Sequence, residues 1–532
     1  MLDTILTWLT FIPLIGAVAI LLLPTGKPGG GDDGEPREPR GWNAMRWVAL
    51  ITTGICLALA IWLFMAFDRT TSAIQFQQIA TWIPTFNIQY HVGVDGVSIL
   101  MVLLTQLIAF IGIIASWRIA KAVKGYFALY LLLQTGMTGV FVALDFVLFY
   151  IFWEVMLLPM YFLIGIWGGP RKEYAAIKFF LYTLFGGVLM LLAILGLYFN
   201  LSEPTFNMLA MMNPANYNPD GWLVQNAPTW FLSFTPKQLV WLAFFIGFAI
   251  KIPAFPFHTW LPDAHVEAPT AISVILAGVL LKMGTYAILR INFAMMPEQT
   301  AAYAGLIAVI GAINIIYGAL CALAQKDLKA LVAYSSISHM GYVMLGMVSW
   351  HNAAGINGAM LQMFNHGTIT AMLFLLVGVI YDRAHHREIA GFGGLWVKVP
   401  VFTGFVIMAF MAALGLPGLS GFISEFLVFV GAFASYRLLA IIGAFGLVIG
   451  AAYLLWTIQR MFFGTLNPKY EKLPDINTRE MAALIPLLII VIFLGVYPAP
   501  ALNLIGPTLD ALLATMQEAA GIAGTVTAVV LP

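Results

Sequence analysis

The sequence predicts an all-α integral membrane protein with about 14 transmembrane helices. Of its 532 residues, 61% are hydrophobic and only 9% are charged, whereas charged residues make up about 25% of an average soluble domain. Fourteen apolar stretches are each long enough to cross a hydrocarbon core, which takes about 20 helical residues. Lysine and arginine gather on alternate loops between them. This composition excludes a soluble enzyme, a disordered chain and a nucleic-acid binder.

The predicted spans follow one another along the chain. They lie near residues 4–23, 46–67, 96–116, 126–144, 146–168, 174–200, 236–262, 270–290, 301–323, 330–350, 353–381, 400–433, 437–463 and 481–502. We expect a flexible loop at 29–34, an irregular external loop at 201–235, and a surface helix with a tail at 503–532. The first span follows Asp3 rather than a basic segment, which favours a retained helix over a signal peptide.

The loop charges predict the orientation of the chain. The loops after even-numbered spans hold only Arg69, Lys237, Arg290 and Arg437, and nearly all other lysines and arginines lie in loops after odd-numbered spans. Because cytoplasmic loops carry the excess of positive charge, the odd-numbered loops are predicted to face the cytoplasm. Both termini then lie on the opposite side.

Four ionisable side chains lie well inside predicted spans: Glu154, Lys251, Lys282 and Glu425. A charge at membrane depth is costly and usually faces the protein interior or a water-filled path. The alternative is a structural ion pair or a side chain that snorkels to the interface. Snorkelling suits Lys178, which lies a few residues from a cytoplasmic span end. We therefore predict that the four deeper charges take part in ion movement.

Two of these charges border breaks in their spans. Prolines follow Lys251 in span seven, and glycines and a proline precede Glu425 in span twelve; the breaking residues are Pro253, Pro256, Gly415, Pro417, Gly418 and Gly421. Spans seven and twelve are five apart, so a repeat with that odd offset is inverted in topology. We predict two inverted five-helix repeats, at 126–290 and 301–463, after three N-terminal spans with a polar loop (1–125) and before span fourteen with the tail (464–532).

Polar residues extend this set of charges. One face of span ten and one of span eleven carry Ser335, Ser338, His339, Tyr342, Gln362, Asn365 and His366. Histidine titrates near neutral pH and can relay protons, although a buried histidine can instead satisfy a carbonyl or hydroxyl group. Burial lowers the pKa of a lysine and raises that of a glutamate, so both approach neutral pH. Our hypothesis is a proton path through Glu154, Lys251, Lys282, His339, His366 and Glu425.

The end of span seven superficially offers metal ligands, His258, Asp263, His265 and Glu267. Its proline and its position at the membrane interface favour a loop or a place of proton uptake instead. The two cysteines lie in separate apolar runs, and nothing resembles a nucleotide-binding loop or a haem ligand pair. We predict neither a metal nor a cofactor in this chain.

Three segments resemble the antiporter-like subunits of the proton-pumping NADH:quinone oxidoreductase (complex I), most closely the bacterial subunit M or NADH dehydrogenase subunit 4 family. They are WLPDAHVEAPTAISVILAGVLLKMGTYAILR, KALVAYSSISHMGYVMLG and LPGLSGFISEF. The resemblance covers about residues 90–480 and implies fourteen helices. It assigns proton-path roles to Glu154, Lys251, Lys282, His339, His366 and Glu425. An acid at 425 resembles subunit M, whereas subunit L carries a lysine there.

The resemblance further implies how the chain works. It would be a proton-translocating subunit of the bacterial inner membrane with periplasmic termini. Flavin, iron–sulfur clusters and quinone would belong to partner subunits, so this chain alone performs no redox chemistry. Its partners would be other complex I membrane subunits, especially neighbouring antiporter-like ones, and lipids, but not nucleic acid. The alternatives are a subunit of a multisubunit sodium/proton antiporter, the membrane arm of a hydrogenase, and a self-sufficient solute transporter.

Overall fold

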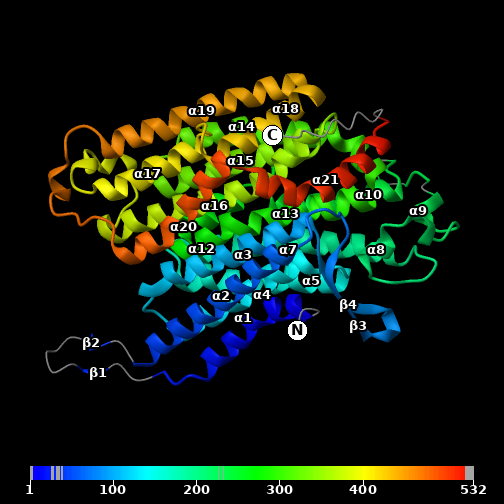
Figure 1. Ribbon diagram of the computed structural model, residues 1–532, viewed down its shortest axis with the longest axis horizontal. Helices are drawn as coiled ribbons and strands as arrows, with labels where there is room; N and C mark the ends of the chain where they lie inside the picture. Colours follow the sequence, from blue (N-terminus) through cyan, green and yellow to red (C-terminus); the bar gives the residue numbers. More distant parts are fainter. Residues whose placement is uncertain are drawn as a thin grey trace.

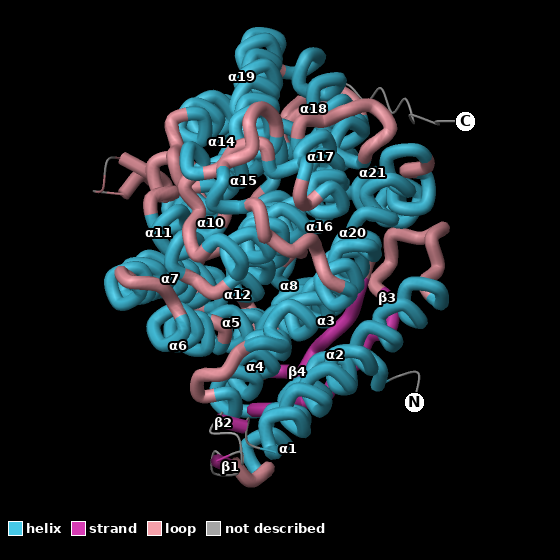
Figure 2. Tube along the Cα trace, turned by 90° about the vertical axis from the view of Figure 1, so that its left-hand side faces the viewer, coloured by secondary structure: helices cyan, strands magenta, loops and turns pink. Residues whose placement is uncertain are grey.

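The computed structural model describes residues 4–25, 29–30, 36–37, 40–225, 227–229, 231 and 233–521. These residues form a bundle of mostly parallel and antiparallel helices (Figure 1). Figure 2 views the bundle along its helices, with α1 (Ile5–Leu22) and α2 (Arg40–Ala66) at one end and α19 (Arg437–Phe462) at the other. Most of the predicted loop at 29–34 and the end of the predicted tail, 522–532, lie outside the described residues.

Eleven helices in the described part of the chain are long and apolar enough to cross a membrane, and each corresponds to a predicted span. Besides α1, α2 and α19, the continuous ones are α3 (Gly96–Ala115), α4 (Val123–Val142), α7 (Lys172–Tyr198), α14 (Pro297–Leu323), α16 (Ala353–Ala384) and α20 (Thr478–Val496). The composite ones are α5 (Phe146–Val155) with α6 (Leu157–Trp167), and α12 (Thr270–Ile275) with η5 (Leu276–Leu280), α13 (Leu281–Ala287) and η6 (Ile288–Phe293).

The other three predicted spans are helical but differ from this pattern. Span ten is α15 (Leu328–Met347), a continuous helix in which serine, histidine and lysine interrupt the apolar residues. Span seven is α10 (Pro236–Lys251) followed, after a break, by α11 (Trp260–Glu267). Span twelve is α17 (Pro400–Ala413) followed by α18 (Ser420–Ser435). Both predicted helix breaks are therefore confirmed.

An asparagine from a neighbouring helix binds the backbone at each break. Asn314 of α14 accepts a hydrogen bond from the Phe255 backbone N–H at 2.8 Å and donates one to the Pro253 carbonyl at 3.3 Å. Asn365 of α16 donates to the Ser420 carbonyl at 2.8 Å. Backbone groups freed at membrane depth persist only where protein or water satisfies them. Asn314 provides part of that satisfaction, whereas Asn365 binds a carbonyl in the first turn of α18.

The expectation of an all-α fold is wrong at two places, and at the larger one β3 (Gln75–Ile83) and β4 (Ile88–Val94) form an antiparallel hairpin. The turn η2 (Pro84–Phe86) joins the strands, followed by Asn87 in the left-handed conformation. This segment alternates apolar and polar residues at the period of a strand, and the sequence analysis examined only stretches of transmembrane length. The two-residue strands β1 (Gly29–Gly30) and β2 (Pro36–Arg37) also pair.

The remaining segments connect or cover the bundle. In the described residues of the predicted irregular loop at 201–235, the elements are short: α8 (Met208–Met211), η4 (Pro214–Asn216) and α9 (Trp222–Gln225). Other turns are η3 (Ser116–Arg118), η7 (Ile389–Gly391), η8 (Leu395–Val397) and η9 (Pro468–Tyr470). The predicted C-terminal surface helix is α21 (Ala499–Ala519), which buries one apolar face against the bundle and is held by a hydrogen bond from Gln517 to the Trp350 carbonyl.

Burial separates inner from outer helices. The α16 helix and the composite helix Thr270–Phe293 are completely buried over their most apolar windows, whereas α2, α7, α19 and α20 expose large apolar side chains. An outer surface of this kind suits contact with lipid or with other membrane subunits. The polar groups of α13, α15 and α16 thus lie in the interior of the bundle.

We expect Gly247→Ala to destabilise the protein, because α7 and α10 touch through glycines. A Cβ at Gly247 would lie 2.7 Å from the Gly186 carbonyl oxygen, so the helices would have to separate, at a cost of about 1–3 kcal/mol. The control is Gly450→Ala on α19, where an added Cβ meets nothing within 4 Å. Thermal unfolding of the detergent-solubilised assembly checks this. Equal melting temperatures for the two variants would contradict it.

Candidate functional site

Glu154 and Lys251 form a pair of opposite charges inside the membrane region. Glu154 lies at the end of α5 and Lys251 is the last residue of α10, and their charges interact. Lys251 is 1% exposed, and its Nζ has no hydrogen-bond partner among the described residues. Instead it lies 5.2 Å from the ring centroid of Trp153 and 5.8 Å from that of Phe179. Aromatic faces stabilise a cation without taking its proton.

Glycines make space for both glutamate carboxylates. A Cβ at Gly187 of α7 would collide with Oε1 of Glu154, and one at Gly415 would lie 2.6 Å from Oε2 of Glu425. Gly415 also has a φ of +77°, in the left-handed region that favours glycine. The break between α17 and α18 therefore leaves space for the Glu425 side chain.

Lys282 lies at the centre of the composite helix, between the π-helical segments η5 and η6. Its Nζ donates a hydrogen bond to the Ala277 carbonyl and contacts Nδ1 of His366 on α16 at 2.6 Å. Lys282 is completely buried and His366 is 2% exposed. Segments of π-helix inside α-helices occur frequently at functional sites. A lysine and a histidine from helices far apart in sequence are thus in direct contact.

The contact continues from His366 to Glu425. The rings of His366 and His339 have centroids 5.5 Å apart, and Nδ1 of His339 lies 3.2 Å from Oε1 of Glu425. Gln362 lies between the last two, with Nε2 at 3.4 Å from each of these atoms. Ser424 donates a hydrogen bond to Oε1 of Gln362. Four of the six predicted residues therefore form one row across α13, α16, α15 and α18.

The structure brings the predicted residues together as two groups. The pair Glu154–Lys251 is one group, and the row Lys282–His366–His339–Glu425 is the other. No hydrogen bond or ion pair in the described part of the chain joins Lys251 to Lys282. Their helices nevertheless touch, because Gly284 of α13 packs against Ile252 at the end of α10.

Of the other polar residues on spans ten and eleven, some lie outside this row. Ser335 bonds the Tyr453 hydroxyl at 2.7 Å, and Ser338 donates to the Ile315 carbonyl at 2.8 Å. Both hydroxyls are thus used in helix packing. Tyr342 does lie beside the row, with its ring centroid 5.9 Å from that of His339.

The possible metal ligands of span seven point in different directions. His258 contacts the Tyr317 hydroxyl, and Asp263 pairs with Lys178 at 2.8 Å. Asp263 and Glu267 both also lie against Arg171. No group of three His, Cys, Asp or Glu side chains among the described residues could hold a metal ion. Lys178, which the sequence analysis considered a candidate for snorkelling, forms an ion pair with Asp263.

Sequence reasoning missed the burial of two groups, His265 and Lys329. His265 is completely buried, stacks on Phe374 at 4.4 Å between ring centroids, and feels the charges of both Lys282 and Lys329. Lys329 donates to the Ala268 carbonyl although the sequence analysis placed it in a loop. A charged residue at a span end gives no signal of burial by itself. The same holds for Arg290, which pairs with buried Asp95 at 2.6 Å.

Fold and site together define a class: a multi-pass membrane protein that holds a row of buried titratable groups beside broken helices, as ion-translocating proteins do. The protein-family profile described as "NADH:quinone oxidoreductase/Mrp antiporter, TM" matches residues 143–450, more than half of the chain. The chain is 42% identical over 511 residues to NADH-quinone oxidoreductase subunit M of Rhodobacter capsulatus, covering 95% of this chain and 96% of that one.

Solved structures agree. A chain of the respiratory complex I from Thermus thermophilus with bound NADH superposes with a TM-score of 0.82 at 28% identity, over 97% of this chain and 100% of that one. The Mrp complex of a Dietzia species, at 20% identity, a TM-score of 0.80 and coverage of 98% and 100%, shares the fold alone. The chain belongs to the NADH-quinone oxidoreductase subunit M family, the proton-translocating, antiporter-like membrane subunits of complex I. The predicted family and function are thereby confirmed.

We expect Gly187→Ala to impair proton translocation while NADH oxidation continues. The new methyl group would displace the Glu154 carboxylate from its place near Lys251. The measurement is the proton-gradient signal per NADH oxidised in vesicles that contain the assembled complex, with a decrease of several-fold expected. Gly305→Ala, on α14 with nothing within 4 Å of the added Cβ, is the matched control. A normal signal in Gly187→Ala would show that the carboxylate can move without consequence.

Proposed function

We propose that protons cross this subunit through Glu154, Lys251, Lys282, His366, His339 and Glu425. The observation that carries the proposal is the unbroken side-chain contact from Lys282 through two histidines to Glu425, together with the separate Glu154–Lys251 pair. All six groups can gain or lose a proton. Groups of this kind at membrane depth mark proton relays by default.

The pair Glu154–Lys251 is suited to gain or release a proton when the distance between its two charges changes. An ion pair about 7 Å apart at an effective dielectric near 20 interacts by roughly 2.4 kcal/mol, which is nearly 2 pKa units. Moving one partner by a few ångströms would therefore release or capture a proton. The ammonium of Lys251 lies against the rings of Trp153 and Phe179 and has no hydrogen-bond acceptor among the described residues. We infer that this pair is the element that responds to a neighbouring subunit.

Within the row, a proton can pass from Lys282 toward Glu425. Transfer of the Lys282 proton to Nδ1 of His366 leaves a neutral amine and an imidazolium. That imidazolium can release its other proton, on Nε2, toward His339, whose ring centroid lies 5.5 Å away. Nδ1 of His339 lies 3.2 Å from the Glu425 carboxylate, where a charge-assisted hydrogen bond can form. The lysine thus supplies the proton that the carboxylate at the end of the row attracts.

The two groups lie on different parts of the bundle. The helices α5 and α18, which carry Glu154 and Glu425, lie toward opposite ends of the bundle in Figure 2. A row of this direction suits lateral communication with neighbouring antiporter-like subunits on both sides. We propose that redox energy reaches the chain through such neighbours, and that flavin, iron–sulfur clusters and quinone belong to partner subunits.

We further propose that the chain crosses the membrane fourteen times, with α10–α11, α15 and α17–α18 completing the eleven long helices. Inverted repeats would span 126–290 and 301–463, between an N-terminal part (1–125) and a C-terminal part (464–532). In Figure 1, β1 and β2 lie at one end of the bundle, and β3, β4, α8 and α9 lie at the other. This supports odd- and even-numbered loops on opposite faces of the bundle. We propose that the membrane is the bacterial inner membrane, with cytoplasmic odd-numbered loops and periplasmic termini.

We expect Lys251→Ala to abolish most of the proton-gradient signal per NADH oxidised, because the alanine removes one of the two charges of the switching pair. The assay is inhibitor-sensitive NADH:quinone reduction in vesicles with a proton-gradient dye. The matched control is Lys398→Gln, an exposed lysine outside the row. Pumping at the control level in a correctly assembled Lys251→Ala complex would refute the role of this lysine.

The crossing number and orientation can be tested with single cysteines in a background of Cys56→Ser and Cys321→Ser. Asp220→Cys lies in the exposed loop after span six and Glu471→Cys in the exposed loop after span thirteen. We expect a membrane-impermeant maleimide to label Asp220→Cys only in right-side-out vesicles and Glu471→Cys only in inverted ones. Labelling of both from the same side would contradict the fourteen-span topology.

A further inference from the structure

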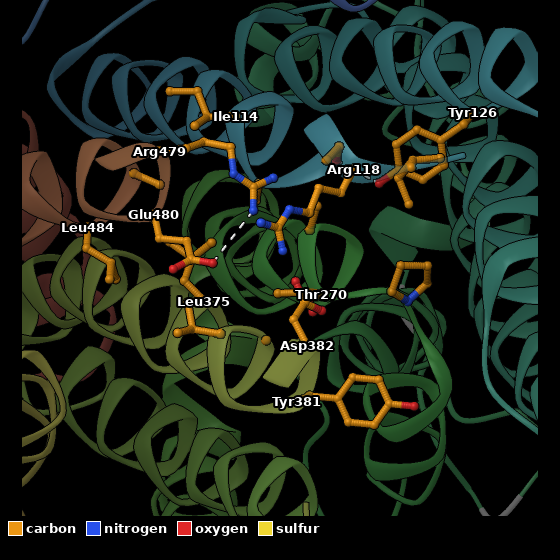
Figure 3. A pocket seen from close by; sticks show the side chains of 18 residues that line it. Ile114, Arg118, Tyr126, Thr270, Leu375, Tyr381, Asp382, Arg479, Glu480 and Leu484 are labelled. Atoms are coloured by element: carbon orange, nitrogen blue, oxygen red, sulfur yellow. Dashed lines mark hydrogen bonds and ion pairs between the residues drawn. The ribbon is translucent and has the colours of Figure 1, made fainter. Parts of the chain in front are cut away.

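A cavity of about 250 Å³ opens between the ends of four helices, away from the row of buried charges. Its walls come from the end of α3 with η3, the start of α12, the end of α16 and the start of α20. Figure 3 shows the guanidinium groups of Arg118 and Arg479 pointing into the same space, with Asp382 nearby. The proton path uses none of these residues.

The charges around this cavity are only partly satisfied. Glu480 is bound by Arg383 at 2.7 Å and 3.1 Å, and lies 3.7 Å from Arg479. The exposed side chains of Arg118 and Asp382 form no hydrogen bond or ion pair with other described residues, whereas NH1 of Arg479 is buried without a partner among them. Asp382 nevertheless feels the charges of both arginines. Two guanidinium groups and two carboxylates therefore line a common space; Glu480 is held by Arg383, whereas Asp382 forms no ion pair with a described residue.

The surroundings match the boundary between lipid headgroups and acyl chains. Arg118, Asp382 and Arg479 all lie at helix ends, on the face that carries most of the basic loops. Apolar side chains, among them Ile114, Leu375 and Leu484, form the rest of the lining (Figure 3). Basic pockets between transmembrane helices on the cytoplasmic side are typical binding places for phospholipid headgroups.

We propose that this cavity binds the headgroup of a phospholipid that carries both a phosphate and a protonated amine. The phosphate would lie between Arg118 and Arg479, because guanidinium groups bind phosphate oxygens through charge-assisted hydrogen bonds. The ammonium would lie on Asp382, and the acyl chains along the apolar lining. The Asp382 carboxylate would repel a second phosphate. The volume of the cavity, about 250 Å³, is below the roughly 300–1,000 Å³ of pockets for drug-sized ligands and suits a headgroup.

The proposal is tested by lipid binding to the whole assembled complex. The complex is stripped of lipid, and short-chain phosphatidylethanolamine, short-chain phosphatidylglycerol or inorganic phosphate is added while thermal unfolding and native mass spectra are recorded. We expect phosphatidylethanolamine to bind and stabilise the wild type. Arg118→Gln/Arg479→Gln should lower its apparent affinity by roughly tenfold or more, since each lost charge-assisted contact costs about a factor of ten.

Two further variants make the outcome decisive. Asp382→Asn keeps the shape of the side chain and should remove the preference for phosphatidylethanolamine over phosphatidylglycerol, whereas Lys398→Gln, an exposed lysine outside the cavity, should change neither lipid. Equal lipid retention in wild type and the double arginine variant would overturn the proposal. Equal stabilisation by inorganic phosphate alone would assign the site to free phosphate and overturn the lipid assignment.

Discussion

The cost of holding an ionised group away from water governs this structure. Each deep charge has a different compensation: Lys251 faces aromatic rings, Lys282 meets an imidazole and a carbonyl group, and Glu425 meets an imidazole and an amide. None of these partners neutralises its charge permanently, as a tight lysine–carboxylate pair would. Lys282 and Glu425 therefore each keep a titratable neighbour, an imidazole, with which a proton can be exchanged.

The same cost explains why the helices break where they do. Unwound backbone at membrane depth needs hydrogen-bond partners, and Asn314 provides them at the first break; at the second, Asn365 binds the first turn of α18. Each break places the end of a helix next to a charge, Lys251 in one case and Glu425 in the other. At the second break, Gly415 also gives space to the carboxylate. Helix breaks, asparagines and charges thus form one arrangement that occurs twice.

The long helices and both helix breaks could be predicted from the sequence, because apolar composition and residue spacing follow directly from which segments are buried. The apolar stretches indicated every long helix, and proline and glycine indicated both breaks. The β3–β4 hairpin was missed because its strands, the first mostly exposed and the second mostly buried, are too short to leave a signal at transmembrane length. The burial of His265 and Lys329 was missed because a polar residue near a helix end has the same local pattern whether it faces water or protein.

The sequence by itself determined that the chain is a multi-pass membrane protein, where its charges lie along the helices, and to which family it is similar. Those properties depend on local composition and on motifs. Only the tertiary structure decided that Lys282, His366, His339 and Glu425 form one row while Glu154 and Lys251 form a separate pair. Contacts between helices depend on how their faces turn toward one another. That rotation is set by packing over the whole bundle, including glycine contacts such as Gly186 with Gly247, and no single span encodes it.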